Sequence, residues 1–208
     1  DQLEPNSPVY NLPESFRLKG MLDTGILERA LNEIIRRHEV LRTTYRMGDS
    51  GPVQIISPSL HLEVPIIDLS GNPENEREVA LAQYLESEAW RPFDLSKGPL
   101  VRASMVKLAS EEHILFFMPH HSVFDGWSWA VFQRELFSLY EAFVAGKPSP
   151  LAELPVQYAD FAHWQSEWLK GEEVEAHVGY WRNKLSGELP VLEIPADFAR
   201  PASQPFRG

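Results

Sequence analysis

The sequence predicts an α+β protein in which helices pack around a small sheet. Three observations predict this class. Several segments repeat apolar residues at helical spacing, four others are short and resemble strands, and the two kinds follow one another in mixed order. Hydrophobic residues make up 43% of the 208, so the chain can bury a real core and is unlike a disordered sequence.

The first predicted helix covers residues 23–39, with Asp23 as its N-cap. Its apolar positions follow helical spacing: Leu27, Leu31, Ile34 and Ile35. Two short strands are predicted next, at 53–57 and 61–67. A second helix begins at Asn72-Pro73, with Asn as the cap and Pro at the first helical position, and it ends before Arg91-Pro92.

Residues 100–108 and 113–118 are predicted to be two strands of a hairpin, because only four residues separate them. The second strand is apolar on both faces, which is typical of a strand in the middle of a sheet covered on both sides. It ends at Pro119 and is followed at once by His120 and His121. The sequence therefore places two histidines at the end of a buried strand.

A third helix is predicted over 126–145, ending before Gly146. One apolar stripe follows its length: Phe132, Leu136, Leu139 and Phe143. Two further helices are predicted after Pro150, and the proline-rich tail from Pro190 is predicted to be a linker.

The composition excludes several classes of function. The net charge of −11 argues against binding to nucleic acid or to an anionic membrane. With no cysteine, there is no disulfide, thiolate metal site or cysteine nucleophile, which fits a cytoplasmic protein. No apolar run reaches the length of a membrane span. The polar start has neither Met nor the pattern of a signal peptide, so we expect residues upstream.

Residues 120–126, His-His-Ser-Val-Phe-Asp-Gly, form the candidate site. Consecutive strand residues point to opposite faces, so one histidine can face a cavity while the other packs inward. Asp125 lies where a carboxylate is favoured, at a helix N-terminus, and Gly126 lets a ligand or backbone come close. A histidine general base suits this pattern, because its ordinary pKa is about 6.5. A metal site and a pair of ordinary core histidines remain alternatives; a third strong ligand is missing from the pattern.

This stretch resembles the His-His-x-x-x-Asp-Gly signature of the condensation domains of nonribosomal peptide synthetases, which have a fold like that of chloramphenicol acetyltransferase. Other stretches match the family's motifs in the same order. They are Arg37-His38-Glu39-Val40-Leu41-Arg42-Thr43, Pro92-Phe93-Asp94-Leu95, Gly98-Pro99-Leu100, Trp127-Ser128 after the signature, and Tyr158-Ala159-Asp160-Phe161-Ala162-His163-Trp164-Gln165. The resemblance covers the whole chain.

The resemblance implies that residues 1–208 are the N-terminal lobe of such a domain, one half of a two-lobed fold with a small mixed sheet. The family's first motif, expected just before Asp1, and the C-terminal lobe are both missing from the sequence. We therefore expect the isolated chain to be inactive.

The resemblance also implies the chemistry. The amino group of an acceptor aminoacyl thioester attacks a donor thioester, and an amide forms. Both substrates hang on phosphopantetheine arms of carrier proteins, no cofactor binds directly, and a neighbouring adenylation domain is a further partner. His121 would be the catalytic residue, as a base or by holding the amine. His120 would pack inside.

By the same resemblance, Asp125 would be structural and paired with an arginine, for which Arg37 and Arg42 are the candidates. Their alternative role is to lie at a helix end as surface charges. Gly126 would keep the donor side open, and its N–H could hold an oxyanion. Rival functions are epimerisation, coenzyme A-dependent acyl transfer, and a non-catalytic recruitment domain, which typically loses the histidines. Cyclisation domains carry aspartate in place of the histidines and are disfavoured.

Overall fold

The computed structural model describes residues 7–49, 51–192, 194–195 and 197–199 of the 208. The chain divides into two compact units, residues 1–159 and residues 160–208. The candidate site and all the strands of the described residues belong to the first unit.

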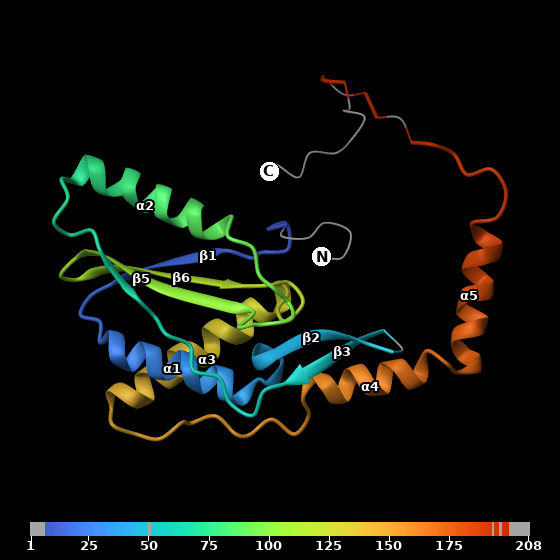
Figure 1. Cartoon of the computed structure of the whole chain (residues 1–208), viewed down its shortest axis with the longest axis horizontal. Coiled ribbons are helices and arrows are strands. Elements are labelled where there is room, and N and C mark those ends of the chain that lie inside the picture. Colours follow the sequence, from blue (N-terminus) through green and yellow to red (C-terminus); the bar gives the residue numbers. More distant parts are fainter. Residues whose placement is uncertain (1–6, 50, 193, 196, 200–208) are drawn as a thin grey trace. The chain divides into compact units, whose positions relative to one another are not determined.

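A four-stranded mixed sheet forms the centre of the first unit, in the order β1-β6-β5-β4 (Figure 1). Strand β6 (Glu112–Pro119) runs antiparallel to both β1 (Glu14–Lys19) and β5 (Val101–Ala109), while β4 (Ile66–Asp68) runs parallel to β5. The β5–β6 hairpin and the central place of β6 confirm the prediction. β1 is a strand that the sequence pattern did not predict.

A separate hairpin joins β2 (Thr43–Gly48) and β3 (Gly51–Ile56), with Thr43 opposite Ile56. The sequence predicted the second of these strands but not the first. Thr43 is buried and Tyr45 half-buried, whereas the outer residues of β2 are exposed. A strand with so few buried positions gives only a weak alternating pattern.

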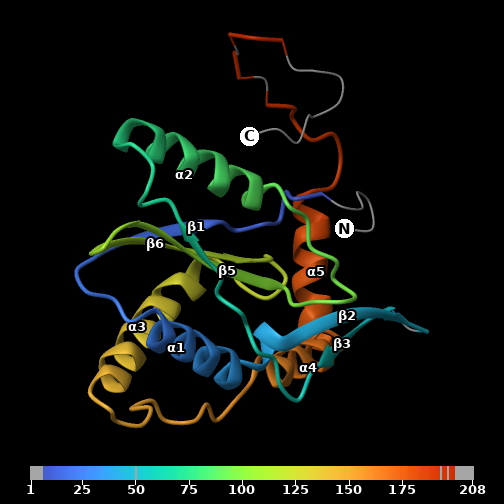
Figure 2. The same ribbon diagram turned by 60° about the vertical axis from the view of Figure 1, so that its left-hand side comes forward.

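Helices cover both faces of the sheet (Figures 1 and 2). Helices α1 (Thr24–Arg37) and α3 (Gly126–Val144) lie together on one face, and α2 (Glu74–Ala89) lies on the other. The main core includes the predicted stripes of α1 and α3, together with Leu115 and Phe117 of β6. A smaller cluster joins Leu81 of α2 to Val106, Leu108 and Ile114. The predicted α+β architecture is confirmed.

Two local predictions are corrected. Residues 61–65 do not form a strand, although Leu62 and Val64 are buried there. The Asn32 side chain takes the place of a partner strand, donating to Leu62 O at 2.9 Å and accepting from Leu62 N at 2.8 Å. Pro73, not Asn72, is the N-cap of α2, because its extended backbone lies just outside the helix. Asp23 caps α1 as predicted, accepting from Ile26 N.

The second unit holds most of α4 (Tyr158–Trp168) and all of α5 (Glu172–Lys184), as predicted after Pro150. Neither helix buries a side chain in the described residues. Large aromatic side chains are exposed along both: Phe161, Trp164, Trp168, Tyr180 and Trp181. Much of the predicted linker, at 193, 196 and 200–208, lies outside the described residues.

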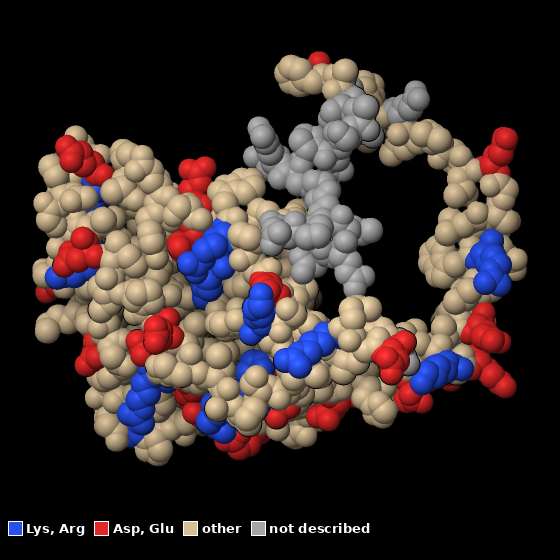
Figure 3. Space-filling model, in the orientation of Figure 1, with Lys and Arg blue, Asp and Glu red and all other residues tan. Residues whose placement is uncertain are grey.

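Charges of both signs are interspersed on the face of the molecule in Figure 3. This mixture agrees with the use of acidic residues for solubility rather than for one dedicated anionic surface. In the part of the chain that the structure describes, no helix is both long and apolar enough to cross a membrane.

Candidate active site

The histidine pair stands where β6 ends. His120 N donates to Leu100 O at 2.9 Å, and His121 N donates to Tyr10 O at 2.8 Å. The main chain of the pair is therefore held on one side by the residue before β5 and on the other by the segment before β1. These bonds fix the direction in which each side chain leaves the strand.

His120 packs inside, as predicted, with 6% of its surface exposed. The Phe93 ring meets it edge to face at 5.9 Å between centroids, and the Tyr10 ring lies 6.1 Å away. Ser122 N donates to His120 Nδ1 at 3.1 Å, and the Ser122 hydroxyl lies 2.9 Å from the same nitrogen. Burial lowers the pKa of His120 to about 4. At neutral pH the ring is therefore uncharged, with its hydrogen on Nε2.

His121 is exposed, in contrast to its neighbour. Its ring lies 6.5 Å from the Tyr10 ring in an edge-to-face arrangement. Just beyond the end of β6, the two histidines thus have opposite environments, as predicted: His120 is an uncharged packing group, and the His121 side chain is exposed. Of the two histidines, His121 is therefore the one whose side chain solvent can reach.

The loop after the histidines is anchored from the core and from the second sheet. Val123 and Phe124 are buried, and the Phe124 ring meets Trp129 at 4.7 Å between centroids. The Tyr45 hydroxyl of β2 donates to Ser122 O at 2.8 Å. The loop is consequently held at its middle residues as well as at its start.

Asp125 is the N-cap of α3 and forms a capping box with Ser128. Its carboxylate accepts from Ser128 N at 2.9 Å and from the Ser128 hydroxyl at 2.7 Å. Chiefly these hydrogen bonds lower the pKa of Asp125, and nearby His121 contributes a little. Gly126 is the first residue of the helix, and a Cβ there would meet open space.

The predicted pairing of Asp125 with Arg37 or Arg42 is wrong in the described residues. Arg42 donates to Ser57 O, and to Glu39 Oε1 at 3.1 Å. Arg37 is only 3% exposed; it pairs with Glu135 of α3 at 3.4 Å and donates to Ala152 O at 2.8 Å. Arg37 is therefore no surface charge either. The Asp125 carboxylate instead accepts hydrogen bonds from Ser128 at the N-terminus of α3.

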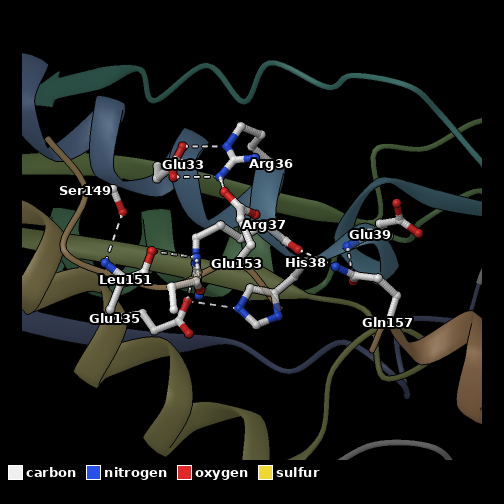
Figure 4. Close-up of polar contacts among 11 residues, drawn as sticks. Glu33, Arg36, Arg37, His38, Glu39, Glu135, Ser149, Leu151, Glu153 and Gln157 are labelled. Carbon is white, nitrogen blue, oxygen red and sulfur yellow. Dashed lines mark hydrogen bonds and ion pairs between the residues drawn. The ribbon is translucent and has the colours of Figure 1, made fainter. Parts of the chain in front are cut away.

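A buried cluster around Glu135 joins α1, α3 and the segment before α4 (Figure 4). His38 Nε2 donates to Glu135 Oε2 at 2.9 Å, beside the Arg37 pair. The Gln157 side chain links in turn to Arg37 O and Glu39 N, at 2.9 and 3.1 Å. Burial acts to raise the pKa of Glu135, but the hydrogen bonds from His38 and Arg37 outweigh it and keep the pKa low. The sequence assigned nothing to His38, since Glu135 is 97 positions away.

An apolar pocket of about 240 Å³ opens between the end of α1 and the start of α3. His38 is on its wall, as are Val123, Phe124 and Trp127 from the motif and the helix that follows. Trp127 is 88% exposed. The Glu135 cluster therefore supports one wall of a hollow that adjoins the motif loop.

A metal was an alternative explanation of the motif. In the described ranges, no three His, Asp or Glu side chains come together as a set that could hold an ion. The arrangement instead offers one exposed imidazole, one occupied carboxylate, and the N-terminus of a 19-residue helix.

A family model for condensation domains matches residues 1–208. With this match over its whole length, the chain belongs to the condensation domain family. Its relatives are nonribosomal peptide synthetases. Chondramide synthase cmdD of Chondromyces crocatus is 47% identical over all of this chain and 5% of its own length. Phosphinothricin tripeptide synthetase PhsC of Streptomyces viridochromogenes is 41% identical over 97% of this chain and 19% of its own.

Solved structures share the fold. The X-domain from teicoplanin biosynthesis is 30% identical with a TM-score of 0.83, over 96% of this chain and 44% of that one. The starter condensation domain of rhizomide synthetase RzmA has a TM-score of 0.79 at 21% identity, over 88% of this chain and 44% of that one. The chain thus spans less than half of these structures and a small part of the synthetases.

Proposed function

We propose that this chain supplies the histidine-bearing lobe of a condensation domain that forms an amide between two carrier-bound thioesters. One observation carries the proposal: His121 is exposed on a loop whose main chain is anchored from three sides, next to the N-terminus of α3. A single, accessible base on a rigid support is what a proton transfer in a substrate cleft requires.

In the proposed reaction, the amine nitrogen of the acceptor attacks the thioester carbonyl carbon of the donor. The C–N bond forms, and the C–S bond breaks when the tetrahedral intermediate collapses. His121 takes the proton that the nitrogen loses and returns it to the departing thiol sulfur, so atoms and charge balance. The Gly126 N–H, at the first position of α3, favours the negative charge that develops on the carbonyl oxygen.

His120 and Asp125 support this chemistry without taking part in it. His120 is uncharged and locked to Ser122, so it does not compete for the proton. Asp125 keeps the end of the loop on the first turn of α3. The expected partners are two peptidyl carrier proteins, whose phosphopantetheine arms bring the substrates, the rest of the condensation fold, and an adenylation domain.

The test uses a protein that carries this chain together with the rest of the condensation fold. Donor and acceptor are loaded on their carriers, and amide formation is followed over a single turnover by mass spectrometry. The His121→Ala variant should lose roughly a hundred-fold or more in rate, the usual contribution of a general base. The His61→Ala variant removes an exposed histidine outside the motif and should keep the rate.

Circular dichroism must show both variants folded. Undiminished amide formation by His121→Ala would remove the histidine from the chemistry. If the wild-type protein with fully loaded carriers makes no amide at all, the condensation proposal itself is wrong.

A second candidate is the docking of a partner protein. The X-domain that this chain resembles has been solved in complex with OxyB, and that structure is 31% identical to this chain. The intact pair His120-His121 favours catalysis, because docking alone needs no exposed base at the end of a buried strand.

A further inference from the structure

Two stretches that match family motifs, 92–95 and 98–100, have so far received no role. Both lie next to Arg102 on β5. Across the β5–β6 hairpin Arg102 stands opposite Met118, and Val101 stands opposite Pro119. Arg102 is therefore close to the end of β6 from which the histidine pair leaves.

The Arg102 guanidinium has no carboxylate partner in any ion pair of the described residues. It donates instead to two main-chain carbonyls, Arg91 O and, at 3.2 Å, Pro92 O. Its Cζ also lies 4.0 Å from the centroid of the Phe93 ring. Burial, with repulsion from Arg91, lowers the pKa of Arg102 to about 10. The group is still charged at pH 7, so these contacts must compensate a partly desolvated cation.

Asn11 also binds the main chain just before Phe93. Asn11 Nδ2 donates to Ala89 O at 2.7 Å and to Arg91 O at 3.0 Å. Asn11 also forms a β-bridge with His120. The main chain between Ala89 and Pro92 is thus tied both to β5 and to the segment that pairs with the histidines.

Phe93 directly follows this segment in the sequence. Its ring is buried, with Arg102 over its face and the His120 imidazole against it edge to face at 5.9 Å. The ring excludes water from His120, and a dry His120 stays uncharged and accepts from Ser122 N. Ser122 directly follows His121. Arg102 is consequently connected through two rings to the residue after the exposed histidine.

We propose that Arg102 is a positioning residue: it holds residues 91–93 so that Phe93 packs on His120 and fixes the direction in which His121 is presented. The inference rests on the proposed function for its effect on catalysis, but the structural link is independent of it. Lysine could not replace this arginine, because one ammonium cannot span two carbonyls and also stack on a ring.

The first test reads the structural link on this chain by NMR. Histidine side-chain ¹⁵N signals report the tautomer of His120, and hydrogen exchange reports the Ser122 amide. The wild-type chain should show the single Nε2–H tautomer and a protected Ser122 amide. In Arg102→Met, Arg102→Lys and Phe93→Leu, we expect mixed tautomers and exchange about ten-fold faster, equivalent to losing one or two hydrogen bonds. Lys107→Met removes a cation from the same strand and should change neither signal.

The second test reads catalysis in the protein with the complete condensation fold. The same three variants should lower kcat about ten-fold and leave KM for the loaded acceptor carrier unchanged, since no contact to the carrier is removed. An unchanged His120 tautomer and Ser122 exchange in folded Phe93→Leu and Arg102→Lys would overturn the proposal, even if Arg102→Met fails to fold. If these signals change but the wild-type protein forms no amide, the connection from Arg102 through Phe93 to His120 is supported and only the proposed function is wrong.

Discussion

Two neighbouring histidines have opposite environments, and this contrast decides which of them can act. His120 is enclosed by aromatic rings and has a pKa of about 4, whereas His121 is exposed. A buried imidazole that stays uncharged throughout the physiological range is a structural group. Of the two motif histidines, only His121 has an exposed side chain, which agrees with the alternation expected at a strand end.

The low pKa of His120 should make stability depend on pH. Between pH 6.5 and pH 4 the unfolded chain binds a proton at His120 that the folded chain does not. The free energy of unfolding should thus fall as the pH falls through this window, by roughly 3 kcal/mol at the limit. In His120→Asn this part of the pH dependence should disappear. Urea unfolding from pH 4 to pH 7.5 measures it.

The control for this prediction is His177→Asn, which replaces a histidine that is exposed. This variant should keep the pH dependence of the wild-type chain. A His120→Asn variant with the wild-type slope would show that His120 titrates alike in the folded and unfolded chains.

At the scale of elements, the most consequential contact is the buried pair between α1 and α3. Arg37 and Glu135 are both almost fully buried, and His38 shares the same carboxylate. A buried pair of this kind adds little over apolar packing, but the loss of one partner leaves a charge without compensation. The register of the two helices that support the motif loop thus depends on one glutamate.

Removal of that glutamate should be costly. Glu135→Ala leaves Arg37 buried and unpaired, and we expect it to lower the free energy of unfolding by about 3–5 kcal/mol. Glu153→Ala, which removes the exposed partner of Arg36, is the matched control and should change stability little. Urea unfolding at pH 7 compares the two. Equal losses in both variants would contradict the structural role given to the Arg37–Glu135 pair.

The elements that the sequence predicted correctly are those with strong local signals. α1 and α3 have long apolar stripes and good caps, and β6 has an unbroken apolar run. β1 and β2 were missed because each is short and largely exposed. The strand predicted at 61–67 was wrong over residues 61–65, while residues 66 and 67 do lie in β4. The alternation of residues 61–65 correctly showed burial, but their hydrogen-bonding partner is the side-chain amide of Asn32, which a sequence pattern does not reveal.

In the candidate site too, the sequence predicted the local contacts and missed the long-range ones. The cap made by Asp125 involves residues three apart, so a local pattern was enough to predict a carboxylate at the helix start. Tyr45, Asn11 and Arg102 act across 77, 78 and 11 positions through contacts that only the fold creates. The proposed arginine partner of Asp125 failed because a resemblance gives residues but not their contacts.

At the scale of the whole molecule, aromatic exposure is uneven. Five of the six tryptophans are among the exposed hydrophobic residues, and Trp129 alone packs against the core in the described part of the chain. Acrylamide should therefore quench most of the tryptophan emission of this chain easily and leave one shielded component. Trp129→Phe should remove the shielded component, whereas Trp127→Phe should remove part of the accessible emission. Survival of the shielded component in Trp129→Phe would contradict the core packing described for the first unit.

The anchoring of the motif loop has a consequence for building chimeric synthetases. The segment 120–126 forms hydrogen bonds with Tyr10, Tyr45 and Leu100. Its conformation therefore depends on residues spread over most of the first unit. A crossover placed between residues 45 and 120 would combine a loop from one parent with anchors from another. Hybrids that inherit residues 10–126 from one parent should preserve the conformation of segment 120–126, and module exchange should place its junctions outside that stretch.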